Sequence, residues 1–269
     1  MMLNVKITAK VELEDTDTPI EQGFRDGNGL PADGSEAIFP IFRMSLIEDW
    51  IPIGTGFFIS NNGLFATAKH VLIDDNTGKP YEDLVGAHTI RRENQVIIRE
   101  IIKIDAHEIA DVAIGMLSNH PQPNAGYGIT NKCFCLTTEI PSYGDKVVTY
   151  AFPQPKVIQH KDGFEVRFIA IPVEGVLEEH YPDGRDQVFF PTSCFQTTMK
   201  LLGGASGGPV TFGDGSVFGI NSSGYDGVDV SFISSIKDIW NLKLINVQLP
   251  SGEIKKEVTI QELQSYGLI

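Results

Sequence analysis

Apolar residues along this chain recur in short runs, several of which alternate with polar residues at a period of two. The first run is NVKITAKVELE, residues 4–14. A period of two places successive side chains on opposite faces of a strand, so it predicts half-buried β-strands. Comparable runs follow: AIFPIFRMSLI, WIPIGTGFFIS, NQVIIREIIKI, DVAIGML, DKVVTYAF, FEVRFIAIPVEGVL, QVFFPTSCFQTT, GPVTF, SVFGINSS and VDVSFI.

Turn-forming residues lie between many of these runs, in SNNG, DGNG, PSYGD, HKDG, YPDG and FGDGS. Many short strands at a spacing of roughly ten residues predict an all-β sandwich or barrel rather than a parallel α/β sheet. The segment DGNGLPADG, residues 26–34, has the composition of a linker.

Helical periodicity is scarce and is clearest in two segments near the C-terminus. In SSIKDIWNL, Ser235 is placed to cap a turn of helix whose apolar residues share one face. In TIQELQSYGLI, Thr259 and Glu262 have the spacing of a capping box. We therefore expect a short helix in each segment.

Composition narrows the class of protein. The chain has 269 residues, of which 42 % are hydrophobic, enough for one large all-β domain or two smaller ones. A formal net charge of −14 without a basic run argues against a nucleic-acid partner. The three cysteines, an odd number, fit a reducing compartment better than a disulfide framework. No secretory signal or membrane-spanning run is recognisable, so we expect a cytoplasmic protein without a membrane partner.

Ser206 lies in an unusually glycine-rich stretch, LLGGASGGPV, residues 201–210. The glycines either permit a tight turn or clear space so that a hydroxyl and backbone N–H groups face one incoming atom. GASGG also fits the Gly-x-Ser-x-Gly motif of α/β-hydrolases, but those enzymes need a histidine after the serine, and the last histidine here is His180. The Gly-Lys-Ser/Thr ending of a phosphate-binding loop is absent from this stretch.

A serine nucleophile needs a base, and the base needs an orienting acid. His70 follows an apolar strand that ends in small residues, a position from which it can face a cleft. Asp111 is a single charge ahead of the apolar strand DVAIGML, where a buried carboxylate must be paired. Taken alone, each residue also fits an ordinary structural role. HEIAD, residues 107–111, resembles a zinc motif but reads as a loop running into a strand, so we expect no metal and no cofactor.

The order His70, Asp111, Ser206 is that of chymotrypsin. With their surroundings, these segments resemble trypsin-like serine proteases of the chymotrypsin fold, nearest the bacterial high-temperature-requirement (HtrA) branch. GTGFFISNNGLFATAKHVL is similar to the branch's Gly-x-Gly-Phe strand and Thr-x-x-His segment, and DVAIGML to its Asp-Ile-Ala-Leu strand. QTTMKLLGGASGGPV and VFGINSSG are similar to its nucleophile segment and cleft strand. The resemblance covers about residues 35–240.

This resemblance implies an all-β fold of two six-stranded antiparallel barrels with the active site between them. The expected divisions are an N-terminal extension at 1–34, a first barrel at 35–130, a second barrel at 131–240 and a C-terminal tail at 241–269. The first barrel carries His70 and Asp111, and the second carries Ser206. The N-terminal extension and the tail have no family counterpart, and the tail includes one of the two short helices.

The resemblance also implies residue roles. Ser206 attacks the peptide carbonyl, His70 transfers the proton, and Asp111 orients His70. The backbone N–H groups of Gly204 and Ser206 form the oxyanion hole. The strand that pairs with the substrate backbone comprises Ser222, Ser223 and Gly224.

Specificity is less determined. The pocket-base position of the family falls on Lys200, which could favour an acidic side chain before the cut or point to solvent. The other residues considered for the pocket are Asp229, as a partner of Lys200, and Asn221, Met199 and Ser231, as walls.

Ala205 stands where digestive members carry an aspartate that pairs with a newly cut N-terminus, so activation by clipping of residue one is not expected. The tail is too short for a PDZ module, so the HtrA mode of regulation does not carry over. We expect an intracellular serine endopeptidase acting on proteins or peptides, with narrow specificity or gating by a regulatory protein partner. The alternatives are an inactive peptide-binding module and an esterase or acyltransferase that uses the same triad.

Overall fold

The computed structural model describes residues 34–44, 50–90, 95–118, 130–160, 163–224, 230–249 and 251–269. The strand predicted at residues 4–14, most of the linker at 26–34, and Asp229 lie outside these ranges. In the described part of the chain, no helix is long and apolar enough to cross a lipid bilayer.

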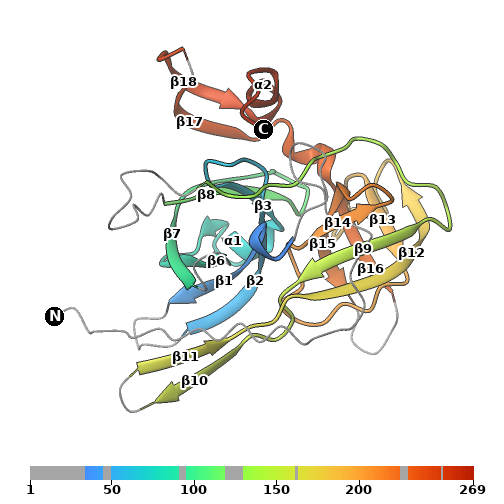
Figure 1. Cartoon of the computed structure of the whole chain (residues 1–269). Coiled ribbons are helices and arrows are strands. Elements are labelled where there is room, and N and C mark those ends of the chain that lie inside the picture. Colours follow the sequence, from blue (N-terminus) through green and yellow to red (C-terminus); the bar gives the residue numbers. More distant parts are fainter. Residues whose placement is uncertain are drawn as a thin grey trace.

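Strands of the described residues close into two six-stranded antiparallel barrels, which confirms the predicted fold class (Figure 1). In hydrogen-bonded order, the first barrel comprises β1 (Ile38–Met44), β2 (Trp50–Phe58), β3 (Leu64–Thr67), β8 (Ala113–Leu117), β7 (Gln95–Ala106) and β6 (Leu84–Ile90). The second comprises β12 (Ile171–Tyr181), β13 (Cys194–Thr197), β16 (Ser231–Ser235), β15 (Ser216–Gly224), β14 (Pro209–Phe212) and β9 (Lys146–Ala151).

Phenylalanines fill the first barrel, and glycines on neighbouring strands make room for them. The Phe39 ring lies 4.8 Å from that of Phe58 and 5.1 Å from that of Phe65, centroid to centroid. A Cβ on Gly86 would come within 2.7 Å of the Phe39 ring. Burying each such ring contributes roughly 1.5–3 kcal/mol to stability, so this interior holds the barrel rigid beneath the site.

One charged side chain is buried in the same barrel. Arg99, 1 % exposed, donates to the Ser118 carbonyl at 2.8 Å and to Asn131 Oδ1 at 2.6 Å. Its Nη1 also lies 3.2 Å from His88 Nδ1. His88 occupies an interior position of β6 and interrupts that strand's apolar pattern, which explains why β6 was not predicted.

Two further predicted runs differ from the strands observed. FEVRFIAIPVEGVL forms two strands, β11 (Gly163–Arg167) and β12, separated at residues 168–170. QVFFPTSCFQTT contains a strand only at its end, in β13. Its first half is a loop, because Asp186 Oδ1 accepts hydrogen bonds from the N–H groups of Val188 (2.9 Å) and Phe189 (2.6 Å) and turns the chain.

Smaller elements connect and flank the barrels: η1 (Gly34–Glu36), α1 (Lys69–Leu72), β4 (Ile73–Asp74) with β5 (Lys79–Pro80), and β10 (Lys156–His160) with β11. The predicted cap at Ser235 is present, and the segment it caps is the 3-10 helix η3 (Ile236–Ile239). The predicted capping box between Thr259 and Glu262 opens α2 (Ile260–Ser265) and is confirmed.

The C-terminal residues form the hairpin β17 (Lys243–Gln248) and β18 (Ile254–Thr259) followed by α2, which lies beside the first barrel (Figure 1). Leu244, Val258 and Leu263 join the hydrophobic cluster of that barrel. Two polar contacts also tie β17 to β7: Lys243 N–H donates to Asp105 at 2.6 Å, and Lys103 Nζ donates to the Ile245 carbonyl at 2.9 Å.

Candidate active site

The strand register of the first barrel brings His70 and Asp111 together. β3 and β8 are antiparallel neighbours, with Thr67 opposite Ala113. A residue just past the end of β3 therefore lies beside one just before the start of β8. His70 is in α1, immediately after β3, and Asp111 precedes β8 by two residues.

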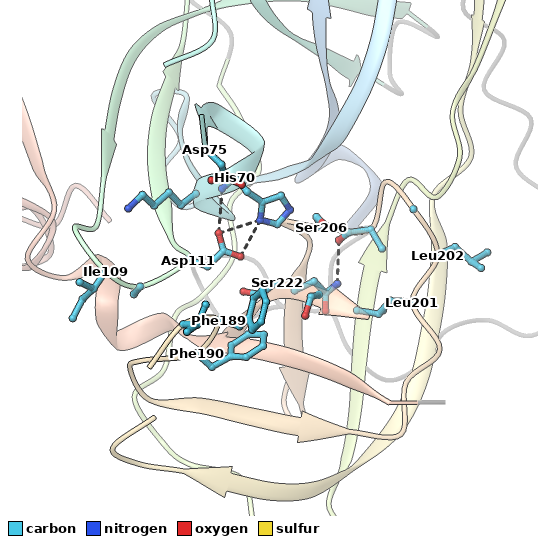
Figure 2. A pocket seen from close by; sticks show the side chains of 17 residues that line it. His70, Asp75, Ile109, Asp111, Phe189, Phe190, Leu201, Leu202, Ser206 and Ser222 are labelled. Atoms are coloured by element: carbon cyan, nitrogen blue, oxygen red, sulfur yellow. Dashed lines mark hydrogen bonds and ion pairs between the residues drawn. The ribbon is translucent and has the colours of Figure 1, made fainter. Parts of the chain in front are cut away.

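Asp111 holds His70 through both the main chain and the side chain. His70 Nδ1 lies 3.0 Å from Asp111 Oδ1 and 2.9 Å from Oδ2, and the His70 backbone N–H donates to Oδ1 at 3.1 Å (Figure 2). Because a carboxylate only accepts hydrogen bonds, Nδ1 must carry the proton. In the neutral ring Nε2 is then an acceptor. This is the tautomer that a general base requires.

The loop that presents Asp111 is braced by its own side chains. His107 Nδ1 accepts hydrogen bonds from the N–H groups of Ala110 at 2.9 Å and Ile109 at 3.3 Å. Lys69 Nζ donates to the Glu108 carbonyl at 2.8 Å. The HEIAD motif is therefore a turn whose histidine stabilises the approach to Asp111 rather than a helix with a zinc motif.

The surroundings of His70 favour its charged form. Burial by itself would lower the pKa of the imidazole. The hydrogen bond that His70 donates to Asp111, the charge of Asp111 and the charge of Asp75 act in the opposite direction and raise the His70 pKa above 6.5. A base with a raised pKa has a higher affinity for a proton near neutral pH.

Ser206 enters the same cleft from the second barrel. His70, Asp111 and Ser206 all line it, and in Figure 2 the His70 ring lies between Asp111 and Ser206. Among the described residues, no hydrogen bond joins the Ser206 hydroxyl to His70. Catalytic hydrogen bonds are often long without substrate and shorten when it binds.

The backbone N–H groups of Gly204 and Ser206 each point away from the carbonyl of the same peptide group. The Gly203 carbonyl accepts from Gln154 N–H at 2.8 Å, and the Ala205 carbonyl accepts from Gly208 N–H at 3.1 Å. In a trans peptide the N–H is antiparallel to the C=O, so the N–H groups of Gly204 and Ser206 face the opposite side. No described residue accepts a hydrogen bond from either group, so both remain available to a ligand.

The glycines around Ser206 are required by backbone geometry and by space. Gly204 has φ +93° and Gly207 has φ +85°, values that other L-residues rarely adopt. A Cβ on Gly207 would overlap Thr67 Oγ1 and the Thr55 carbonyl oxygen. The loop can therefore lie directly against the first barrel only without side chains at this point.

The cleft has a volume of about 540 Å³ and an apolar rim (Figure 2). Four exposed apolar side chains line it: Ile109 (63 % exposed), Val188 (77 %), Phe189 (70 %) and Leu202 (48 %). Sequence patterns do not indicate that these four residues line a cleft, and they predict a strand at Val188 and Phe189. Asp75 also lines the cleft and was not anticipated.

Only some of the residues predicted to bind substrate line the cleft. Ser222 and Ser223 line the cleft, and Gly224 ends β15 beyond them. Lys200 is exposed and is not among the lining residues. Of the three possible walls, only Asn221 lines the cleft; Met199 and Ser231 are buried in the second barrel.

A family model of the trypsin-like peptidase domain matches residues 54–220. The chain belongs to the trypsin-like peptidases. As a member of this family it is a serine endopeptidase, and the matched span includes His70, Asp111 and Ser206.

Solved structures of proteases share the fold of this peptidase. The active form of the Rv3671c protease from M. tuberculosis is 16 % identical with a TM-score of 0.53, covering 86 % of this chain and 91 % of that one. An inactive form of an Rv3671c mutant is 18 % identical with a TM-score of 0.51, covering 76 % and 83 %. The serine endoprotease from Yersinia pestis is 18 % identical with a TM-score of 0.51, covering 77 % and 64 %. A search of curated proteins returned no significant match.

Proposed function

We propose that this peptidase cleaves peptide bonds through a Ser206–His70–Asp111 triad and an acyl-enzyme intermediate. The observation that carries the proposal is that a carboxylate-bound His70 lines the same cleft as Ser206, while the N–H groups of Gly204 and Ser206 have no acceptor among the described residues. This arrangement supplies a base and a site for an oxyanion on either side of a hydroxyl.

In the acylation step, Ser206 Oγ bonds to the substrate carbonyl carbon while its proton passes to His70 Nε2. The carbonyl oxygen becomes an oxyanion that accepts hydrogen bonds from the Gly204 and Ser206 N–H groups. When the C–N bond breaks, the His70 proton goes to the leaving amine. Water then attacks the acyl-enzyme with His70 again acting as base, which releases the carboxylic acid and restores Ser206.

The preferred substrate of this proposal is an extended peptide with large apolar side chains near the cut. The support is the exposed rim formed by Ile109, Val188, Phe189 and Leu202, because exposed apolar side chains gain most from covering by other apolar groups. Ser222, Ser223 and Gly224, at the end of β15, would pair with the substrate backbone. Lys200 is exposed outside the cleft lining and is not part of this proposal.

An intracellular setting and control by a partner protein are also parts of the proposal. No disulfide joins the three cysteines, all of which lie in the described part of the chain, and this fits a reducing compartment. Burial raises the pKa of Cys194 to about 11, so this cysteine stays a neutral thiol at neutral pH and is not a competing nucleophile.

Labelling with a fluorophosphonate, measured by intact mass, tests the triad. The chain offers a matched control, because Ser193 Oγ lies 3.2 Å from His180 Nε2 in a second serine–histidine pair outside the cleft. We expect one adduct on the wild type and on Ser193→Ala, and none on Ser206→Ala or His70→Ala.

An unlabelled wild type, or a label that survives Ser206→Ala, would contradict the proposal. Cleavage of ester but not peptide substrates by the labelled enzyme would point instead to an esterase. On a suitable peptide, Ser206→Ala should lower kcat by roughly 10⁶-fold.

A further inference from the structure

Thr55 connects the two barrels at the nucleophile loop, residues 201–208. It lies in β2 of the first barrel and is fully buried. Its backbone N–H donates to the Ser206 carbonyl at 2.8 Å, and its own carbonyl accepts from Thr67 Oγ1 at 2.7 Å. The main chain of Thr55 is therefore fixed by one barrel and holds the catalytic serine of the other.

The Thr55 hydroxyl makes two more contacts within the second barrel. It donates to the Gly204 carbonyl at 2.9 Å and accepts from the Phe152 N–H at 3.2 Å. It thus joins the nucleophile loop to the adjacent segment 152–155. Both main-chain groups would lose this partner if the hydroxyl were removed, and buried groups without a partner are costly.

Segment 152–155 holds the same loop from its other end. Gln154 N–H donates to the Gly203 carbonyl at 2.8 Å. Gln154 adopts φ +49°, a left-handed conformation that costs a non-glycine residue roughly 1–2 kcal/mol. The peptide groups on either side of Gly204 are therefore each anchored by an external hydrogen bond, one from Gln154 and one from Thr55.

These anchors matter most at the peptide between Gly203 and Gly204, where no side chain restrains the backbone. Gly203 and Gly204 lack side chains, so rotation of the peptide between them meets little steric resistance. That peptide carries the Gly204 N–H, and its rotation would withdraw this donor from the proposed oxyanion hole. Ala205 offers only a methyl group, so no charged side chain at that position secures the loop.

Building on the proposed function, we infer that Thr55 is a positioning residue of the oxyanion hole. Its hydroxyl, together with the left-handed main chain of Gln154, keeps the Gly204 N–H directed at the developing oxyanion. Neither group contacts the substrate. Because the oxyanion forms only in the transition state, loss of this orientation affects kcat rather than KM.

Three variants test the Thr55 hydroxyl. Thr55→Val removes it at nearly constant volume, and Thr55→Ser keeps it. Thr211→Val is the matched control, since Thr211 is also buried and donates to a main-chain carbonyl, that of Val148 at 3.2 Å, but does not line the cleft. We expect Thr55→Val to lower kcat by about 10²–10³-fold, the effect of losing one oxyanion donor, with KM within about threefold.

Thr55→Ser should restore most of kcat, and Thr211→Val should lower the melting temperature without changing kcat. The affinity of a peptide aldehyde, whose adduct carries an oxyanion, should fall in parallel with kcat. A Thr55→Val enzyme with wild-type kcat, or one whose losses match those of Thr211→Val, would overturn the inference. Fluorophosphonate labelling of the wild type keeps the outcomes apart, because failure of that label would count against the triad itself.

Gln154 gives a second test should Thr55→Val fail to fold. Valine disfavours a left-handed backbone, whereas glycine adopts it freely. Gln154→Val should reduce kcat and Gln154→Gly should retain it, although both remove the same side chain. Asn246→Val, at another left-handed position (φ +55°) in the β17–β18 hairpin, controls for backbone strain alone and should leave kcat unchanged. Equal kcat values for Gln154→Val and Gln154→Gly would also contradict the inference.

Discussion

Asp111 binds His70 at two separate points, the backbone N–H at 3.1 Å and the ring Nδ1 at 2.9 Å. Replacing the carboxylate with the amide in Asp111→Asn introduces an N–H₂ donor opposite these donors. The ring would then favour a proton on Nε2, where it cannot accept one from Ser206. We expect kcat to fall by about 10⁴-fold while substrate still binds. Steady-state kinetics measure this, and a loss below tenfold would contradict the assigned role of Asp111.

The pH dependence of activity should depend on Asp75. In the proposed mechanism His70 acts as a base only when unprotonated, so its raised pKa should place the acidic limb of kcat/KM above pH 6.5. Removing the negative charge in Asp75→Asn lowers the His70 pKa and should move that limb to lower pH. Asp74→Asn, one residue away, is the control and should leave the limb in place. A limb that moves equally in both variants would show that the charge of Asp75 is not the cause.

Cleavage preference should follow the apolar rim. Profiling with a peptide library is expected to show large apolar side chains near the cut. Phe189→Ser should raise KM for these peptides several-fold, because the exposed ring loses its contact with substrate. Lys200 is exposed outside the cleft lining, so Lys200→Ala should leave the profile unchanged. A preference for acidic side chains that disappears in Lys200→Ala would restore the selector role considered from the sequence.

Substitution of two glycines, Gly207 and Gly252, should distinguish the destabilising effect of steric overlap from that of backbone strain. Gly207 and Gly252 have nearly the same φ, +85° and +87°, but only Gly207 has neighbours that a Cβ would overlap. Gly252→Ala should lower the free energy of unfolding by about 1–2 kcal/mol, the left-handed penalty alone. Gly207→Ala should lower it by about 1–3 kcal/mol more, the usual effect of overpacking. Urea unfolding measures both, and equal losses would mean that the loop moves away from Thr67 without cost.

Stability at mildly acidic pH should be limited by His88. Burial, followed by the charge of Arg99, lowers the pKa of His88 to about 4, whereas the unfolded chain has the ordinary 6.5. Between these values only the unfolded state binds the proton. The stabilisation is therefore complete above pH 6.5 and falls as pH drops toward 4, by on the order of 3 kcal/mol. His88→Gln should flatten the dependence of unfolding free energy on pH in this window, and an unchanged slope would contradict the assignment.

Local patterns predicted much of this peptidase. Alternation and turn residues indicated most of the barrel strands, and the Thr259–Glu262 spacing indicated the capping box, because each depends on residues close in sequence. The order and surroundings of His70, Asp111 and Ser206 indicated a triad through resemblance. The structure brings these three residues to one cleft, and their roles remain to be tested.

Features built from distant residues could not be predicted. Thr55 and Gly204 are separated by 149 positions in the chain, and no periodic pattern in the sequence indicates their contact. Val188 and Phe189 have strand-forming side chains, but the carboxylate of Asp186 turns their backbone into the cleft rim. Arg99 can be buried because the Ser118 carbonyl and Asn131 accept its hydrogen bonds. The pattern of charges along the sequence does not reveal these partners.

The contacts of Thr55 and Thr67 with the nucleophile loop have a consequence for biosynthesis. The N-terminal barrel carries His70 and Asp111 and emerges from the ribosome before Ser206 does. The nucleophile loop emerges afterwards, and in the folded protein Thr55 of that barrel donates hydrogen bonds to it. Under the proposed triad, either barrel separated from the other would lack part of the catalytic centre, so peptide hydrolysis would require both barrels of one chain.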